Sequence, residues 1–309
     1  MQYIISLIFL FISIISYSAT PINQVVVFGD SLSDNGNLYE YLDHQLPVSP
    51  PYYQGRFSNG PVWIELLMKQ LYPINAQAHL SDYAFGGSGI SADENDNFSL
   101  NNQIKKYLID NNGLASSSSL YVVWIGANNY FNLPDNQNEA VESVINGIRI
   151  NIEELVNLGA KHFLILNLPN LGRIPAAIEF DARDELGFLS LEHNLQLQHL
   201  ITDLRLKYPE VQFIDYNITE ILDDIISYPK NYGFINSTAT CSDLDDEEPQ
   251  TSRLSKSLFL ATIDRQKMLT KDKCYGYLFF DLYHPTAHAH EILSAEISKE
   301  LMSLDLEFV

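Results

Sequence analysis

Apolar residues along the chain gather into short runs that alternate with longer stretches of helical spacing. The short runs are predicted as strands because β-branched and aromatic residues dominate them: 25–29, 83–85, 121–125, 162–168 and 211–216. The longer stretches carry the spacing of amphipathic helices: 61–71, 102–109, 140–158, 189–208 and 285–304. Strands separated by helices predict an α/β fold, in which helices cover both faces of one parallel sheet.

The pattern contains no internal repeat and no linker, so residues 19–309 are predicted to form a single three-layer domain. Two segments lie outside the regular alternation. Residues 46–60 are rich in Pro, Tyr and Gly and are predicted as a long ordered loop. Residues 241–274 open with an acidic run that we interpret as solvated, inert surface. Because long loops in compact domains are usually functional or disordered, either segment is a candidate to shape a substrate entrance.

The first residues of the chain predict export. Residues 1–18 carry no charge, and their apolar run at 3–15 is followed by small residues in the positions that signal peptidases require. An uncleaved membrane anchor is the alternative, but the run is shorter than the ~20 residues of a spanning helix. We therefore expect residues 1–18 to be a signal peptide and the mature protein to be secreted.

Charge and composition narrow the class of partner. The chain has 309 residues, of which 46% are hydrophobic, which is ample for a large core. Its 18 Lys and Arg residues against 39 Asp and Glu residues give a net charge of −21. Such a surface repels phosphate backbones and anionic lipid headgroups, so no nucleic-acid partner is expected.

The chain contains two cysteines, Cys241 and Cys274. In a reducing compartment they would be two unrelated buried thiols. In an exported protein they predict one disulfide that closes a loop of roughly 30 residues, nominally worth ~4 kcal/mol. Their spacing matches no zinc-binding pattern.

Candidate chemistry begins where the first predicted strand ends. Residues 25–29 run directly into Asp30 and Ser31, and turn-forming and helix-capping residues follow. Ligands of an open α/β sheet bind beyond the carboxyl ends of its strands, so Ser31 is expected at the functional edge, near a helix N-terminus. Ser31 is therefore either a helix cap or a catalytic nucleophile, and its companions decide between the two.

A serine nucleophile needs a general base, and the base needs an acceptor that orients it. Asp281 and His284 supply both within four residues. Because His284 precedes Pro285, we expect extended or turn backbone immediately before a helix, from which the imidazole can reach another loop. His288 and His290 follow on that helix, and we interpret them as surface or packing residues.

Two other strand ends carry groups suited to an oxyanion. The run 83–85 ends at Gly86 and Gly87, whose backbone N–H groups can approach a ligand closely, and the run 121–125 leads to the Asn128 amide. Each is also typical of a plain turn, but three such strand ends together favour acyl transfer.

A metal-dependent phosphoesterase is the alternative chemistry. Its ligands would be Asp30, Asp34 and His284. It leaves Gly87 and Asn128 without a role.

In order and spacing, these blocks resemble those of the GDSL lipases and esterases, also called SGNH hydrolases, over nearly the whole chain. The resemblance implies a three-layer, flavodoxin-like fold with a five-stranded parallel sheet in the order 2-1-3-4-5. It implies Ser31 as nucleophile, His284 as base and Asp281 as the acid that orients the base. The backbone N–H groups of Ser31 and Gly87 and the Asn128 amide would form the oxyanion hole, with no cofactor and no metal.

Two positions qualify this resemblance. Gly86 is the alternative to its neighbour Gly87 as an oxyanion donor. Asn129 stands where the family pattern has Asp, and it keeps the shape of that residue but not its charge.

Within the family, residues 53–63 (YQGRFSNGPVW) and the pair Cys241 and Cys274 are similar to secreted bacterial lysophospholipases A and glycerophospholipid:cholesterol acyltransferases. This implies a secreted hydrolase of lysophospholipid acyl esters, with phospholipase A activity and a sterol acceptor as further options. It also implies a protease partner that activates the enzyme by cleaving the 241–274 loop. The alternatives are a short-chain or carbohydrate carboxylesterase and a non-catalytic lipid- or glycan-binding protein of the same fold.

Overall fold

The computed structural model describes residues 21–91, 93, 96–241, 274–304 and 306–309. The expected signal peptide (1–18) and most of the 241–274 loop lie outside the described residues. Secretion by that peptide and activation by cleavage of that loop therefore stay predictions.

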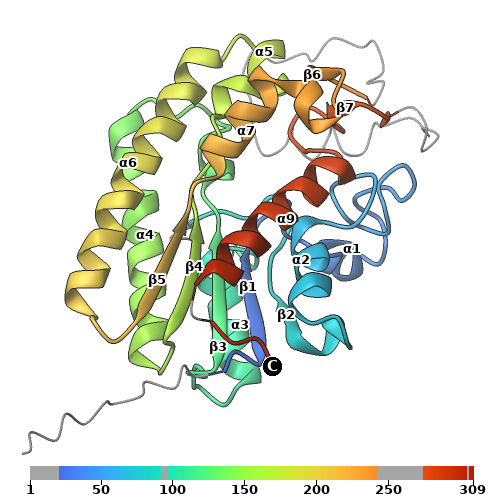
Figure 1. Ribbon diagram of the computed structural model, residues 1–309. Helices are drawn as coiled ribbons and strands as arrows, with labels where there is room; N and C mark the ends of the chain where they lie inside the picture. Colours follow the sequence, from blue (N-terminus) through green and yellow to red (C-terminus); the bar gives the residue numbers. More distant parts are fainter. Residues whose placement is uncertain (1–20, 92, 94–95, 242–273, 305) are drawn as a thin grey trace, which may run out of the picture.

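A parallel sheet of five strands forms the middle layer (Figure 1). Its strands follow the order β2-β1-β3-β4-β5, and each neighbouring pair is parallel. This confirms the predicted fold class and strand order. The strands are β1 (Gln24–Gly29), β2 (Leu80–Asp82), β3 (Ser119–Trp124), β4 (His162–Leu166) and β5 (Gln212–Tyr216).

Both faces of the sheet are buried, which explains why its inner strands are continuous apolar runs. Val26 and Phe28 of β1 pack into the core on one face, and Val25 and Val27 pack into the core on the other. The first face is covered by α3 (Leu100–Asp110), α4 (Gln137–Asn157) and α6 (Arg183–Lys207). The second face is covered by α2 (Trp63–Leu71) and α9 (Ala287–Ser303), which pack on each other.

The edge strand β2 differs from its prediction. The strand is Leu80–Asp82, whereas the apolar residues 83–85, expected to be the strand, follow it as extended chain. The N–H groups of Tyr83 and Phe85 still donate to the β1 carbonyls of Val27 and Gly29, at 2.8 and 3.3 Å. An edge strand is only half buried, so its hydrophobic pattern is weak and the core-facing residues after it gave the stronger signal.

Several short elements were not predicted, most of them around the carboxyl end of the sheet. They are α1 (Asn37–Tyr41), α5 (Pro175–Glu179), α7 (Ile218–Ser227), the short helices η1 (Ala76–His79), η2 (Ala127–Asn129), η3 (Leu171–Arg173) and η4 (Pro229–Tyr232), and a second sheet of β6 (Asn236–Thr240) and β7 (Tyr277–Phe279). In Figure 1, α5, α7, β6 and β7 gather at this end of the molecule.

A disulfide and a pair of backbone hydrogen bonds join distant parts of the chain. A disulfide connects Cys241, just after β6, to Cys274, just before β7, as the cysteine count predicts for an exported protein. At the other end of the sheet, the Ile22 N–H donates to Glu307 O at 2.6 Å and the Val309 N–H donates to Ile22 O at 3.0 Å. No helix in the described parts of the chain is both long enough and apolar enough to cross a membrane.

Candidate active site

Ser31 lies on a tight turn at the carboxyl end of β1. The Asp30 carboxylate accepts the Leu32 N–H at 3.0 Å, and the Asp30 carbonyl accepts the Asp34 N–H at 3.0 Å. The next helix, α1, begins only at Asn37. The expectation that Ser31 lies at a helix N-terminus is therefore wrong, because the chain closes a single turn around Asp30 first.

The side chains of Ser31, His284 and Asp281 form one hydrogen-bonded line. His284 Nε2 lies 2.8 Å from Ser31 Oγ, and His284 Nδ1 lies 2.7 Å from Asp281 Oδ2. These distances are those of a nucleophile, a base and an orienting carboxylate. His284 precedes the first turn of α9, in the turn backbone that its proline neighbour predicts.

The Asp281 carboxylate is completely buried and fully hydrogen-bonded. Burial by itself would raise the pKa of Asp281, but the His284 imidazole and the other hydrogen bonds hold it below its ordinary value. Oδ1 accepts the backbone N–H groups of Tyr283 and His284, at 2.8 and 2.7 Å. Oδ2 accepts the hydroxyl of Tyr52 at 2.7 Å. The carboxylate is therefore fixed in the orientation that faces the imidazole.

Tyr52 belongs to the Pro- and Tyr-rich loop at 46–60, and neighbouring residues of that loop also hold the segment that carries the base. The Phe57 ring lies 5.2 Å from the His284 ring, between centroids. Ser58 Oγ donates to Pro285 O at 2.9 Å, and Asn59 Oδ1 accepts the Ala287 N–H at 2.7 Å at the start of α9. This loop was one of two candidates to shape a substrate entrance; none of its residues lines the pocket beside Ser31, and its described contacts hold the segment of His284.

The two glycines after β2, Gly86 and Gly87, differ in their backbone environment. The Gly86 N–H donates to the buried Asp34 carboxylate at 2.7 Å. Gly87 follows with φ of +74°, a conformation that glycine adopts without strain. Asn128 Nδ2 donates to the carbonyl of Ser88 at 2.8 Å. The ends of β1, β2 and β3 are thus tied to one another by hydrogen bonds.

Asn129 holds the same loop with both ends of its amide. Its Oδ1 accepts the Ile90 N–H at 2.9 Å, and its Nδ2 donates to the Ile90 carbonyl at 2.7 Å. An ionised Asp can accept the first bond but cannot donate the second. The departure from the family pattern therefore has a structural role in this chain.

The buried side-chain amide of Gln103, on α3, links the end of β1 to the loop after β2 (residues 86–90, here called the glycine loop). Gln103 Oε1 accepts the Gly29 N–H at 2.9 Å, and Gln103 Nε2 donates to Gly29 O and to Ser88 Oγ, each at 2.8 Å. The side chain thus pairs with the end of β1 as a neighbouring strand would.

The Asp34 carboxylate is engaged by backbone N–H groups of the surrounding loops. Its carboxylate accepts four backbone N–H groups, from Gly36, Asn37, Leu38 and Gly86. Burial raises the pKa of Asp34 to about 6, although these hydrogen bonds act in the opposite direction. Because both oxygens are engaged by backbone donors, the metal-dependent alternative loses one of its three ligands.

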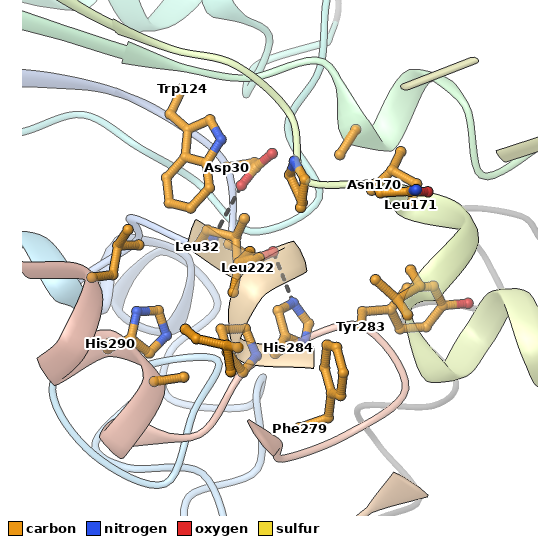
Figure 2. A pocket seen from close by; sticks show the side chains of 18 of the residues that line it. Asp30, Leu32, Trp124, Asn170, Leu171, Leu222, Phe279, Tyr283, His284 and His290 are labelled. Carbon is orange, nitrogen blue, oxygen red and sulfur yellow. Dashed lines mark hydrogen bonds between the residues drawn. The ribbon is translucent and has the colours of Figure 1, made fainter. Parts of the chain in front are cut away.

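A largely apolar pocket opens beside Ser31 and His284 (Figure 2). It encloses about 940 Å³ of empty space, open solvent at its mouth included. Asp30, Asn128 and His290 also line it. Its apolar walls come from η3, α7, β7 and α9 and from the chain after β1 and β3, and include Leu32, Phe131, Leu171, Ile174, Leu222, Ile225, Phe279 and Leu293.

The two remaining histidines of α9 differ from each other. His288 is exposed and lies 2.9 Å from Tyr232 O. His290 is buried, and its Nδ1 accepts the Trp63 N–H at 3.2 Å. The interpretation as surface and packing residues therefore fits each of them, and His290 also borders the pocket.

Sequence reasoning missed Tyr52, Gln103 and α7. The signal for α7 was present, because Asn217 caps it by accepting the Glu220 N–H, and isoleucines and leucines recur at helical spacing. Tyr52 and Gln103 act through contacts with residues far along the chain, for which spacing gives no signal.

Comparison with known proteins gives relatives of the same kind over most of the chain. Phosphatidylcholine-sterol acyltransferase of Aeromonas hydrophila is 30% identical over 312 aligned positions, which cover 90% of this chain and 89% of the relative. Secreted effector protein SseJ of Salmonella typhimurium is 29% identical, over 88% of this chain and 62% of the effector. Thermolabile hemolysin of Vibrio parahaemolyticus is 25% identical, over 89% of this chain and 63% of the hemolysin.

The last two matches span less than two thirds of the relatives' own length. The sequence pattern of one family runs from β1 into α9 and includes Ser31, the glycine loop, Asn128, Asp281 and His284. Since this pattern, GDSL-like lipase/acylhydrolase, matches residues 25–297, the chain belongs to that family.

Proposed function

We propose that this protein is a secreted serine hydrolase that cleaves the fatty-acyl ester of lysophospholipids, with phospholipase A and acyl-transfer activity at the same site. The family supports the hydrolysis of carboxylic esters. The apolar pocket beside Ser31 is the observation that carries the choice of substrate. Its apolar walls suit a fatty-acyl chain, whereas an acetyl group or a sugar gains little from contact with them.

The apolar lining of the pocket also predicts how strongly kcat/KM depends on the length of the acyl chain. Each CH₂ group that moves from water into an apolar wall gains about 0.8 kcal/mol, which is roughly a fourfold gain in kcat/KM per CH₂. This gain stops at the chain length that fills the pocket. Acetyl esters and long-chain esters should therefore differ by several orders of magnitude, which separates this proposal from a short-chain or carbohydrate esterase.

In the proposed mechanism, Ser31 Oγ attacks the ester carbonyl and His284 Nε2 takes its proton. Asp281 holds the imidazole and stabilises the imidazolium ion. The lysolipid alcohol leaves with the proton from His284, and an acyl ester remains on Ser31. Water, or the hydroxyl of a sterol, then attacks this ester with His284 again as base and regenerates Ser31.

The tetrahedral oxyanion is assigned to the N–H groups of Ser31 and Gly87 and to the Asn128 amide. Gly86 is the weaker candidate in the doublet, because its N–H is already bonded to Asp34. The Asn128 amide has two N–H groups, and the bond to Ser88 O uses one of them. The second is left for the oxyanion.

Acyl transfer and secretion have separate support. The Aeromonas relative is named for transfer from phosphatidylcholine to a sterol, which favours a sterol as an acceptor here. The Cys241–Cys274 disulfide favours an oxidising compartment, in line with the predicted export. Activation by cleavage between these cysteines also stays part of the proposal, and comparing intact and nicked protein on one substrate tests it.

Lipid product analysis tests the proposal. Purified protein is incubated with lysophosphatidylcholine, phosphatidylcholine and cholesterol together, and the Ser31→Ala variant serves as the control. We expect free fatty acid from lysophosphatidylcholine, and sterol ester in addition if acyl transfer occurs. The proposal is overturned if the wild type releases acetate from acetyl esters but no fatty acid, or if Ser31→Ala is equally active. Lipid binding without turnover would identify a non-catalytic lipid-binding protein instead.

A further inference from the structure

The hydroxyl of Tyr52 reaches the active site from far along the sequence. It donates to Asp281 Oδ2 at 2.7 Å, across 229 positions of the chain. Tyr52 itself is buried, and its ring packs edge-on against Phe280 with the centroids 5.1 Å apart. Burial, together with the charge of Asp281, raises the pKa of Tyr52, so its phenol stays protonated and acts as a donor.

The Asp281 carboxylate offers about four lone-pair sites, and the described structure supplies four donors. Three of them come from the same short segment: the N–H of Tyr283, the N–H of His284 and the Nδ1 of His284. Tyr52 is the fourth, and it shares Oδ2 with the imidazole. Without it, a buried anionic oxygen would face the imidazole with one donor fewer.

We propose that Tyr52 is a positioning residue of the catalytic machinery, which acts on Ser31 through Asp281 and His284. This inference rests on the proposed function, because it needs Ser31 to react by transfer of its proton to His284. Nothing in the sequence blocks of the family assigned a role to this tyrosine, which lies just before residues 53–63.

Two physical effects follow from the shared oxygen. The hydrogen bond fixes the carboxylate plane, and so aims His284 Nε2 at Ser31 Oγ. The phenol dipole also draws charge away from the imidazole, so that the imidazolium ion is stabilised less than it would be by a bare carboxylate. Removing the hydroxyl therefore weakens orientation but makes the imidazolium form more stable.

Other titratable groups face the same pair and do not change in the test. Tyr283 lies in the same segment, and Asp30 approaches from the end of β1. His290 approaches from α9. A change in the pH profile on removing the Tyr52 hydroxyl alone is therefore assigned to that hydroxyl.

The test compares Tyr52→Phe with the matched control Tyr53→Phe. Both variants lose one hydroxyl from adjacent positions, and the half-buried Tyr53 is not among the donors to Asp281. Phe at position 52 keeps the ring contacts, so thermal unfolding should remain cooperative. We expect Tyr52→Phe to lower kcat about tenfold with little change in KM, and to move the acid limb of the kcat/KM profile to higher pH by about half a unit to one unit. We expect Tyr53→Phe to match the wild type.

A double variant separates positioning from a general loss of structure. In an Asp281→Ala background the acceptor of the Tyr52 hydroxyl is gone, so adding Tyr52→Phe should reduce kcat no further. Equal losses in both backgrounds, or an unmoved acid limb, would overturn the role of Tyr52. Failure of the proposed function has a different signature: the wild type would resist labelling at Ser31 by a fluorophosphonate and would show no Ser31-dependent hydrolysis.

Discussion

Replacing Asn129 with Asp would restore the family pattern, and we predict that it impairs this enzyme. The reason lies in the paired hydrogen bonds to Ile90, where the amide accepts at 2.9 Å and donates at 2.7 Å. In Asn129→Asp, an ionised oxygen would face the Ile90 carbonyl at the position of the present donor. The variant loses one hydrogen bond and places two acceptors in contact.

The expected loss of kcat/KM follows from the free energy of the lost hydrogen bond. A lost hydrogen bond that leaves a partly buried carbonyl unpaired costs about 1–3 kcal/mol, which corresponds to roughly a 5- to 150-fold loss of kcat/KM if the glycine loop must be ordered for catalysis. Protonation of the new carboxyl group would restore a donor to the Ile90 carbonyl. The loss should therefore be large at pH 8 and smaller near pH 5.

The measurement is the ratio of variant to wild-type kcat/KM on one lysophospholipid at each pH, because the ratio cancels the pH dependence that the two enzymes share. Asn129→Ala is the matched control: it loses both bonds without adding a charge, so its ratio should not depend on pH. An Asn129→Asp enzyme that equals the wild type at pH 8, or whose ratio stays flat with pH, would refute the reasoning.

Three other substitutions probe the oxyanion site, the pocket and the core. Asn128→Ala should lower kcat by about 10²–10³, as for other oxyanion donors, and unchanged turnover of a long-chain ester would remove Asn128 from the site. Ile174→Trp fills part of the pocket, so the preferred acyl chain in a chain-length series should shorten while acetyl-ester hydrolysis is retained. Burial lowers the pKa of His193 to about 3, so the folded state does not take up the proton that the unfolded state binds below about pH 6.5. His193 therefore makes stability fall as the pH drops from 6.5 toward 3, by about 1.4 kcal/mol per unit, and His193→Gln should remove that part of the slope in denaturant unfolding at several pH values.

The sheet and the chemistry at its strand ends could be predicted from the sequence because both are local. Buried parallel strands leave continuous apolar runs, and the residues after them mark the functional edge. Ser31 was found in this way, whereas Asp281 and His284 were found as the base and the orienting acceptor that a serine nucleophile needs. The structure brings the three side chains within hydrogen-bond distance. The weaker pattern of the half-buried edge strand misplaced β2 by a few residues.

The residues that support the active site lie far along the chain from the groups they contact. No spacing pattern in the sequence therefore indicates them. Tyr52 and Gln103 are ordinary residues until the fold places them against Asp281 and Gly29. The pocket is assembled in the same way, from segments that range from the end of β1 to α9. Of these, α7 alone had a signal that could have been used, in its Asn217 cap and its apolar spacing.

The distance along the chain between Ser31 and His284 has a consequence for biosynthesis. These residues are separated by 253 positions, and Tyr52 is separated from Asp281 by 229 positions. A nascent chain that ends before residue 281 carries Ser31 after its first strand but lacks both Asp281 and His284. Contacts of such range also form late in folding, after the loops between them have closed. The nascent chain therefore lacks the hydrogen-bonded line of Ser31, His284 and Asp281 until the segment just before α9 has been made and has folded into place.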